Sequence, residues 1–599
     1  MGVVASLPSS GRGLPMSFDR VVRGGEIVDG TGRGPRRADL GIRGGIIVEI
    51  APSLDPGGAE VIDAEGAIVT PGFVDLHTHY DGQASWDSEM LPSAVHGVTT
   101  ALVGSCGVGF APVRKADRER LVELMEGVED IPGSALAEGL RWDWETFGDY
   151  LDALERRPRT LDVGAHVPHD AVRVYVMGER GLAREDATDD DIASMRGLVR
   201  QALLDGAIGF TTGRTDNHRA KDGSATPASD VGARELAGIA SAFQGLSSGI
   251  LQAVSDFDMA VSPERFDAEF DVLEAMAAAS GRPMSVSTMQ RDGATDQWRR
   301  ILARLEQANA RGVTMKAQVA PRGIGVMLGL EATFHPFVGF PSYKAISHLP
   351  LSERVARLRD PETKRRILSE KSEPIGGDGS PIPPLADQLL ASIDFVAMKL
   401  YRLGPNPSYE PAKESSLFAE AMRRGVSTLD VVYDALLEQD GRELLYFPIF
   451  NYGGHSLDDV ATMLHHPLSM VALGDGGAHV GTICDASMQT FFLLHWARDR
   501  EAARFSLGDA VRKLTGEPAA WAGMRDRGLL EVGRRADLNV IDFARLGLLP
   551  PRLAHDLPGG GKRFLQDARG YRATLVRGIP TLRDDRLTGE MPGSVVRRA

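Results

Sequence analysis

The sequence predicts an α/β protein: a (β/α)8 barrel of the TIM type, a small β-sandwich built from both chain ends, and a large insertion between strands 7 and 8. Three observations support this prediction. First, short β-like runs separated by turns precede Pro71. Second, the strand-like runs after Pro71 alternate mostly with amphipathic stretches. Strand alternating with helix favours parallel βα units, and eight such units favour a closed barrel. Third, β character returns after residue 520.

The first unit is predicted over residues 17–70, as the N-terminal part of the β-sandwich. Short apolar runs at Val21–Val22, Ile27–Val28 and Ile46–Val48 are separated by Gly-Gly and Asp-Gly turns, which is typical of short strands. Residues 1–16 lack the apolar segment of a signal peptide, so we expect a disordered leader there.

The barrel is predicted over residues 71–520. Its eight candidate strands are GFVDLHTH, VTTALVGSC, LDVGAHVPH, GAIGFTTG, GILQAVSD, PMSVSTMQ, TMKAQVAP and MVALGDGGAH. Intervening stretches such as ASMRGLVRQALLDG have the spacing of amphipathic helices. Each strand run ends in polar or ionisable residues, where the C-terminal face of a barrel carries its chemistry.

An insertion of roughly 150 residues, about 325–465, separates the last two strand runs, and a connection this long favours a lid or subdomain over the barrel mouth. It contains the Pro-rich tract EPIGGDGSPIPPLAD. Residues 521–599 include RADLNVIDF and YRATLVRGIPTL, which we expect to pair with the N-terminal strands as the second part of the β-sandwich.

Composition excludes several classes of protein. Lysine and arginine number 67 against 82 acidic residues, a net charge of −15 without a basic stripe, which argues against nucleic acid and anionic membrane partners. No apolar run of about 18 residues predicts a membrane span. Two cysteines in so long a chain do not form a disulfide framework. We expect a soluble, cytoplasmic protein with a small-molecule partner; a homo-oligomer is compatible with the sequence but not indicated by it.

His77 and His79 end the first barrel strand. Residues two apart in a strand point to the same face, so both imidazoles would project together and form half of a divalent metal site. Asp75, Tyr80 and Asp81 are candidates to orient the rings. The alternative is two unrelated surface histidines.

Cys106 and Asp475 end the second and the last strand. Cys106, in VGSCGVGFAP, is either a thiolate metal ligand or a buried structural cysteine; Cys484 is interpreted as structural. Asp475, in ALGDGGAH, is a candidate to hold the metal, accept a proton from water and return it to a leaving amine. Its alternative role is to form a Gly-rich turn.

Weaker candidates follow other strand ends and are considered for substrate binding. A guanidinium binds a carboxylate bidentately, so arginines at the mouth are of particular interest. The candidates are Arg322, Arg214, His218, His169, Arg173 and His479.

The segments GFVDLHTHYD, GSCGVGFAP, ALGDGGAH and RGLLEVGRRADLNVIDF together resemble the amidohydrolase superfamily, in its N-acyl-D-amino-acid deacylase (D-aminoacylase) branch. The resemblance runs from about residue 17 to the end and is weakest across 325–465. It implies an amide hydrolase with one or two zinc ions, other divalent metals being possible. His77, His79 and Cys106 would be metal ligands, and Asp475 would be general base and then general acid.

Two departures from the branch bear on the site. Its metal-binding histidines at the ends of strands five and six are absent from GILQAVSDFD and PMSVSTMQ. Gln252, Ser255 or Asp256, or a histidine such as His169 or His218, completes the shell, or the site is a weaker mononuclear one. The tyrosine and arginine that hold the substrate carboxylate are also missing, and Arg322 is the candidate to replace the tyrosine.

Two other functions remain open at this stage. A cyclic-amide hydrolase of the hydantoinase or dihydropyrimidinase type usually carries a carboxylated lysine at the fourth strand, and GAIGFTTG has none. A catalytically inactive barrel acting as a binding or scaffold protein is suggested by the missing histidines. Against it, His77, His79, Cys106 and Asp475 are all present, and neutral drift is not expected to spare all four.

Overall fold

The computed structural model describes residues 17–257, 262–376, 387 and 391–598. The expected leader, 1–16, lies outside these ranges. Among the described helices, none is both long and apolar enough to cross a bilayer.

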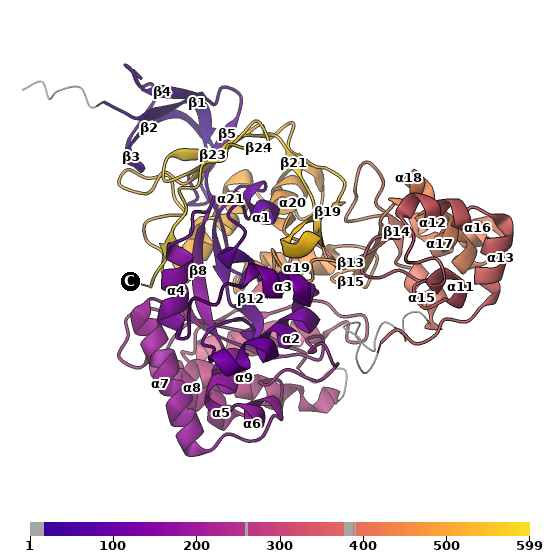
Figure 1. Cartoon of the computed structure of the whole chain (residues 1–599). Coiled ribbons are helices and arrows are strands. Elements are labelled where there is room, and N and C mark those ends of the chain that lie inside the picture. Colours follow the sequence, from indigo (N-terminus) through magenta and orange to yellow (C-terminus); the bar gives the residue numbers. More distant parts are fainter. Residues whose placement is uncertain (1–16, 258–261, 377–386, 388–390, 599) are drawn as a thin grey trace, which may run out of the picture.

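Strands from both chain ends form one nine-stranded sheet, seen at the top of Figure 1. Strand β17 pairs antiparallel with β5, with Leu538 opposite Pro71 and Ile541 opposite Ile68, and this pairing joins the two ends. Val22, Leu40 and Val69 pack there against residues of the tail. The members in spatial order are β24 (Arg586–Leu587), β23 (Ile579–Arg583), β22 (Tyr571–Val576), β17 (Leu538–Ile541), β5 (Ile68–Pro71), β1 (Arg20–Ile27), β2 (Arg36–Arg43) and β3 (Ile46–Ala51), with β4 (Glu60–Asp63) beside β1.

Eight parallel strands form the barrel sheet, one for each predicted run, so the fold class is confirmed. In chain and spatial order they are β6 (Phe73–Asp75), β7 (Val98–Val103), β8 (Asp162–Pro168), β9 (Gly209–Arg214), β10 (Ile250–Ser255), β11 (Met284–Ser287), β12 (Met315–Val319) and β16 (Ser469–Val471). Just past their ends, the first and last strands are joined by two backbone hydrogen bonds, from Asp475 N to His77 O (3.1 Å) and from His79 N to Gly476 O (2.8 Å).

Helices follow the strands, and helix α7 shows how residues at a helix end set its boundary. Helix α7 begins with a capping box between Thr188 and Asp191 and ends at Gly206, whose φ of 116° suits glycine. The helices around the barrel are α1 (Leu91–Ala94), α2 (Arg118–Glu129), α3 (Gly133–Gly139), α4 (Phe147–Glu155), α5 (His169–Met177), α6 (Glu179–Leu182), α7 (Asp189–Asp205), α8 (Ala233–Ala240), α9 (Phe266–Ser280), α10 (Gln297–Ala310), α19 (Asp458–His465), α20 (Met488–Leu494), α21 (Leu507–Leu514) and α22 (Gly516–Trp521).

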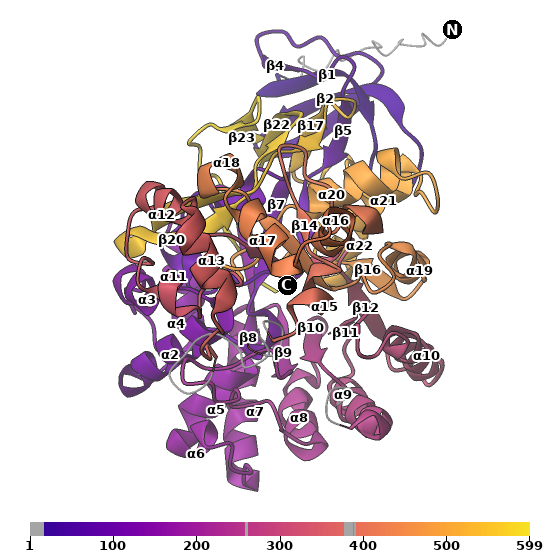
Figure 2. The ribbon, with the colours of Figure 1, turned by 90° about the vertical axis from the view of Figure 1, so that its right-hand side faces the viewer.

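The insertion has its own hydrophobic core, with Phe337, Tyr343 and Val431 among its buried residues. In Figure 1 it stands to the right of the barrel, and in Figure 2 this side faces the viewer. Its sheet reaches the barrel mouth, where Met327 N donates to Thr482 O (2.8 Å) in the loop after β16. The elements are β13 (Ile324–Leu328), β14 (Tyr401–Arg402), β15 (Leu445–Phe450), α11 (Pro341–Lys344), α12 (Leu351–Leu358), α13 (Pro361–Ser369), α15 (Ile393–Ala397), α16 (Leu417–Arg424), α17 (Thr428–Leu436) and α18 (Glu438–Gly441).

The tail does not lie wholly in the terminal sheet, which differs from the prediction for 521–599. Strand β25 (Val595–Val596) pairs in parallel with barrel strand β8 at Val163 and Gly164. The hairpin of β19 (Arg552–Leu557) and β20 (Gly561–Leu565) reaches the loop after β16, where Phe564 N donates to Val480 O (2.7 Å). The strands β18 (Gly547–Leu548) and β21 (Ala568–Arg569) form a separate small pair.

Candidate metal centre

Four predicted side chains converge where β6, β7 and β16 end. His77 Nε2 lies 3.1 Å from Cys106 Sγ and 3.5 Å from Asp475 Oδ1, and His79 Nε2 lies 3.8 Å from the same carboxylate oxygen. The ligand atoms of His77, His79 and Cys106 all lie within 4.8 Å of one another, and the three residues are buried. The Asp475 side chain is 15% exposed, so it faces the approach to the site.

These separations fit a divalent metal ion. On a tetrahedron with zinc–nitrogen, zinc–oxygen and zinc–sulfur bonds of ordinary length, ligand atoms lie roughly 3.3–3.6 Å apart. The three distances given above, 3.1–3.8 Å, lie near that spacing, and the ligand atoms of the two histidines and the cysteine are all within 4.8 Å of one another. Two imidazoles, a thiolate and a carboxylate are also a donor set that suits zinc.

The turn that carries Cys106 needs an unusual backbone. Cys106 has a φ of 57°, between Gly104 (80°) and Gly107 (82°). A side chain at Gly104 would collide with the carbonyl oxygen of His166 on the neighbouring strand. The strained turn is held by Gln252, whose Oε1 accepts a hydrogen bond from Cys106 N (2.8 Å).

Two further residues orient the histidine ligands. His77 Nδ1 donates to Gln318 Oε1 (2.7 Å), which keeps Nε2 free for a metal. His79 Nδ1 lies 3.0 Å from Glu129 Oε1, and the carboxylate favours a proton on Nδ1. Sequence reasoning missed both. Gln318 is a polar residue at the end of a predicted apolar strand, which is a usable signal, whereas Glu129 at the end of α2 carries none.

Burial dominates the pKa shifts of His77, Cys106 and Asp475, whereas contact with Glu129 holds the pKa of His79 well above its usual value. Burial and the neighbouring His79 lower the pKa of His77 to about 3, so its ring is neutral. Burial raises the pKa of the Cys106 thiol and raises that of Asp475 to about 7, against the opposing effect of His79. The charged forms of both acids are therefore disfavoured until a positive charge such as a metal ion lies beside them.

The side chains considered for the rest of the shell have other partners. Gln252 Oε1 accepts from Cys106 N, and Ser255 Oγ accepts from Phe257 N (2.9 Å). Asp256 accepts from the Thr215 hydroxyl (2.9 Å) and pairs with Arg291 (2.8 Å). On β11, Ser285 accepts from Gln318 Nε2 (2.9 Å), so the ends of β10 to β12 form a polar network.

The structure does not bring the predicted arginines into the centre, and this corrects their interpretation as substrate-binding groups. Arg322 pairs with Asp485 at 2.9 Å and neither side chain has exposed surface. Arg214 pairs with Glu269 (2.8 Å) and Arg173 with Glu235 (2.6 Å), both buried. Removing a buried arginine from its carboxylate is strongly unfavourable, so these groups are structural.

The histidine candidates divide into two groups. His169 is fully buried between Thr212 (2.9 Å) and Glu235 (3.0 Å), away from the ligand atoms, and the same correction applies to it. His218 and His479 come together, with ring centroids 6.3 Å apart.

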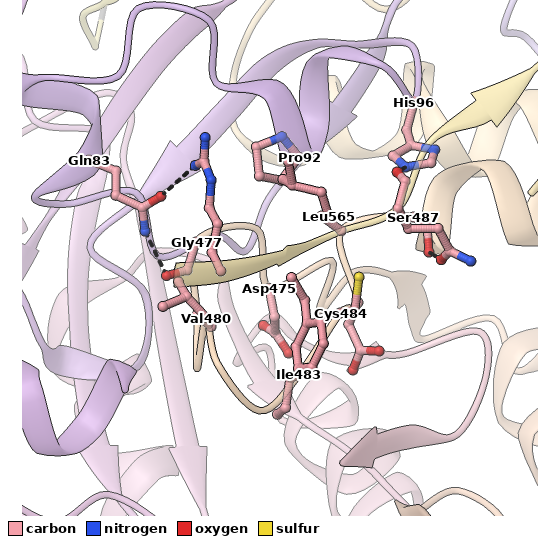
Figure 3. A pocket seen from close by; sticks show the side chains of 16 residues that line it. Gln83, Pro92, His96, Asp475, Gly477, Val480, Ile483, Cys484, Ser487 and Leu565 are labelled. Carbon is pink, nitrogen blue, oxygen red and sulfur yellow. Dashed lines mark hydrogen bonds between the residues drawn. The ribbon is translucent and has the colours of Figure 1, made fainter. Parts of the chain in front are cut away.

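A cavity of about 20 Å³, enough for about one water molecule, lies beside Asp475 and is drawn in Figure 3. Its lining includes Cys484, Ser487 and His96. Gln83 fixes the loop after Asp475 by donating to Gly477 O (2.9 Å).

The amidohydrolase family model matches residues 60–375 and 439–581. The chain belongs to this family. A D-aminoacylase from Alcaligenes xylosoxydans xylosoxydans is 28% identical over 584 residues, covering 97% of this chain and 98% of that protein. An N-acyl-D-aspartate deacylase from the same organism is 37% identical over 199 residues, 33% of this chain and 37% of that protein.

Solved structures share the fold. A D-aminoacylase variant in complex with copper chloride has a TM-score of 0.62 at 24% identity, covering 97% of this chain and all of that one. An N-acyl-D-glutamate deacylase from Bordetella bronchiseptica, with zinc and a phosphonate inhibitor, has a TM-score of 0.59 at 23% identity with the same coverage. This amidohydrolase is therefore a hydrolase that cleaves amide bonds with the help of a divalent metal.

Proposed function

We propose that this amidohydrolase removes the acyl group of an N-acyl-D-amino acid, using zinc held by His77, His79, Cys106 and Asp475. The convergence of these four side chains at the barrel mouth carries the proposal. The relatives, a D-aminoacylase and deacylases of acidic N-acyl-D-amino acids, support the substrate class.

Each residue has a defined task in the proposed reaction. When bound, the metal polarises the amide carbonyl and lowers the pKa of water. Asp475 accepts the proton of the attacking water and delivers it to the amide nitrogen as the carbon–nitrogen bond breaks. The acyl group leaves as a carboxylate and the amino acid as a free amine. Gln318 and Glu129 keep the two imidazoles oriented.

The test is a panel of N-acetyl, N-formyl and longer N-acyl amino acids, in D and L forms, incubated with zinc-loaded protein. Release of free amine from D substrates is expected, and Asp475→Asn should abolish it at a free zinc concentration that saturates the variant, while thermal stability is kept. Hydantoin and dihydrouracil serve as cyclic substrates. Turnover of these alone would favour the cyclic-amide function, and no turnover of any amide would favour an inactive binding protein.

We also place the protein in the cytoplasm, because the two cysteines are unpaired and a thiolate ligand is best preserved in a reducing compartment. Fractionation of cells with an antibody against the chain tests this location.

A further inference from the structure

One arginine beside the barrel mouth keeps donors that no carboxylate of the described chain occupies. Arg291 lies in the loop between β11 and α10, and its side chain is 16% exposed. The side chains of Arg322, Arg214 and Arg173 are exposed by 0%, 6% and 2%. Arg291 Nη2 lies 2.8 Å from Asp256 Oδ1, while its Nε and Nη1 have no hydrogen-bond partner among the residues that the structure describes.

Asp256 does not depend on Arg291 for its hydrogen bonds. Its Oδ1 accepts from the Thr215 hydroxyl (2.9 Å), and its Oδ2 accepts from Asp216 N (2.6 Å). A guanidinium has five N–H donors in a fixed fork. The contact with Asp256 therefore holds one edge of Arg291 and leaves the other donors free for a ligand.

The insertion fixes the residues on both sides of Arg291. Asn451 Oδ1 accepts from Gln290 N (2.8 Å), and Asn451 N donates to Gln290 O (2.9 Å). On the other side, Lys399 Nζ lies 2.7 Å from each carboxylate oxygen of Asp292. Because both neighbours are anchored, the guanidinium is positioned before any ligand arrives.

An apolar cluster connects Arg291 with the metal centre. The guanidinium carbon lies 5.0 Å from the centroid of the Phe450 ring, at the end of β15. Phe450 packs in one cluster with Leu473 and Ile483, on either side of Asp475 in the chain. Ile483 and Asp475 line the same small cavity (Figure 3). Arg291 thus belongs to the wall of the mouth that β11 and the insertion form.

We propose that Arg291 binds the carboxylate of the substrate. This inference rests on the proposed function, since an N-acyl amino acid carries a carboxylate one carbon away from the amide nitrogen. A guanidinium binds a carboxylate through two parallel hydrogen bonds, which orients the amide as well as holding it. The binding group then comes from strand six and is positioned by the insertion, whereas the resemblance places such groups after strands seven and eight, where this chain lacks them.

The experiment compares N-acetyl-D-leucine with N-acetyl-D-leucinamide, in which a neutral carboxamide replaces the carboxylate. The leucine side chain suits the apolar surface of Phe450 and Ile483. Amine release by the zinc-loaded protein gives kcat and KM for each compound. Arg291→Met should raise the KM for the carboxylate compound about 10- to 150-fold, the effect of losing a hydrogen bond to a charged group, and leave the carboxamide unchanged. Arg291→Lys keeps the charge without the fork and should give an intermediate KM.

The matched control is Arg299→Met, on the outer helix α10. Arg299 also has an acidic partner, Asp459 at 3.0 Å, and also lies over an aromatic ring, that of Trp298 at 4.0 Å. This variant should behave as wild type. Equal losses for the two compounds in Arg291→Met, or a carboxylate KM within about threefold of wild type, would overturn the inference. Near-ultraviolet circular dichroism checks folding, and Arg291→Gln replaces the methionine variant if that one does not fold.

Failure of this inference and failure of the proposed function are distinguishable. Amidase activity without preference for the carboxylate compound over its carboxamide refutes only the role of Arg291. If wild type cleaves neither compound, isothermal titration calorimetry of both with the zinc-loaded protein decides. Tighter binding of the carboxylate compound that Arg291→Met abolishes then refutes only the proposed reaction, and neither binding nor cleavage of that compound overturns both.

Discussion

Replacing Gln318 by leucine tests whether this residue, which does not bind the metal itself, controls how tightly His77 binds it. Gln318 Oε1 accepts the proton of His77 Nδ1 at 2.7 Å, and both side chains are buried. Leucine keeps most of the volume but leaves the Nδ1 proton without an acceptor. His77 then lowers its energy by moving the proton to Nε2, which is the atom that faces Cys106 and Asp475.

The size of the effect follows from the lost contact. Leaving one buried donor unpaired costs about 1–3 kcal/mol. At about 1.4 kcal/mol per tenfold change, zinc affinity should fall roughly 5- to 150-fold. Loss of an outer partner of a ligating histidine typically costs about 10- to 100-fold, which agrees.

The assay is competition for zinc with a chelator of known affinity, alongside thermal melting of the metal-free protein. Gln318→Glu retains an acceptor and should restore most of the zinc affinity. Gln290→Leu is the matched control, because Gln290 is buried and its Oε1 accepts from Gly453 N (2.8 Å) outside the centre. If Gln318→Leu lowers the melting temperature but leaves zinc affinity within threefold of wild type, Gln318 is only a packing residue and the reasoning fails.

Three further predictions concern two of the proposed metal ligands and a buried histidine outside the centre. Asp475→Asn should lower kcat by about 10²- to 10⁴-fold even at a zinc concentration that fills the site, measured by amine release with elemental analysis to check zinc content; a fully active variant would exclude Asp475 as the proton carrier. Cys106→Ser should weaken zinc binding while the fold is kept, and unchanged affinity would make Cys106 a structural residue. Burial lowers the pKa of His96 to about 4, so the unfolded chain binds the extra proton between pH 6.5 and 4 and stability falls as pH drops through that window. At a limiting slope of about 1.36 kcal/mol per pH unit, reached only below the unfolded pKa, wild type should lose about 1.6 kcal/mol more than His96→Gln between pH 6.5 and 5 in urea unfolding, and equal losses would contradict this.

The barrel and the centre of the site could be predicted because their signals are local. Each strand is a short apolar run, and His77, His79, Cys106 and Asp475 each follow such a run directly. Parallel strands bring their carboxyl ends to one face, so these side chains meet without any information about loops.

The arginines were misinterpreted because a sequence does not show which carboxylate an arginine meets. The partner of Arg322 is Asp485, 163 residues later, and that of Arg214 is Glu269, 55 residues later. Both carboxylates lie on segments whose packing depends on the whole fold. An arginine after a strand is equally consistent with a substrate ligand and with a buried ion pair, and here burial decides for the ion pair.

Hydrogen-bonding side chains occupy strands five and six, where the D-aminoacylase branch carries metal-binding histidines. Gln252 uses its amide oxygen to hold the backbone of Cys106, and Gln318 links His77 to Ser285 on β11. The side chains at these strand ends therefore act on the metal ligands through hydrogen bonds instead of binding metal themselves. It follows that the ligand set is concentrated on the β6, β7 and β16 side of the mouth, where Glu129 adds its negative charge.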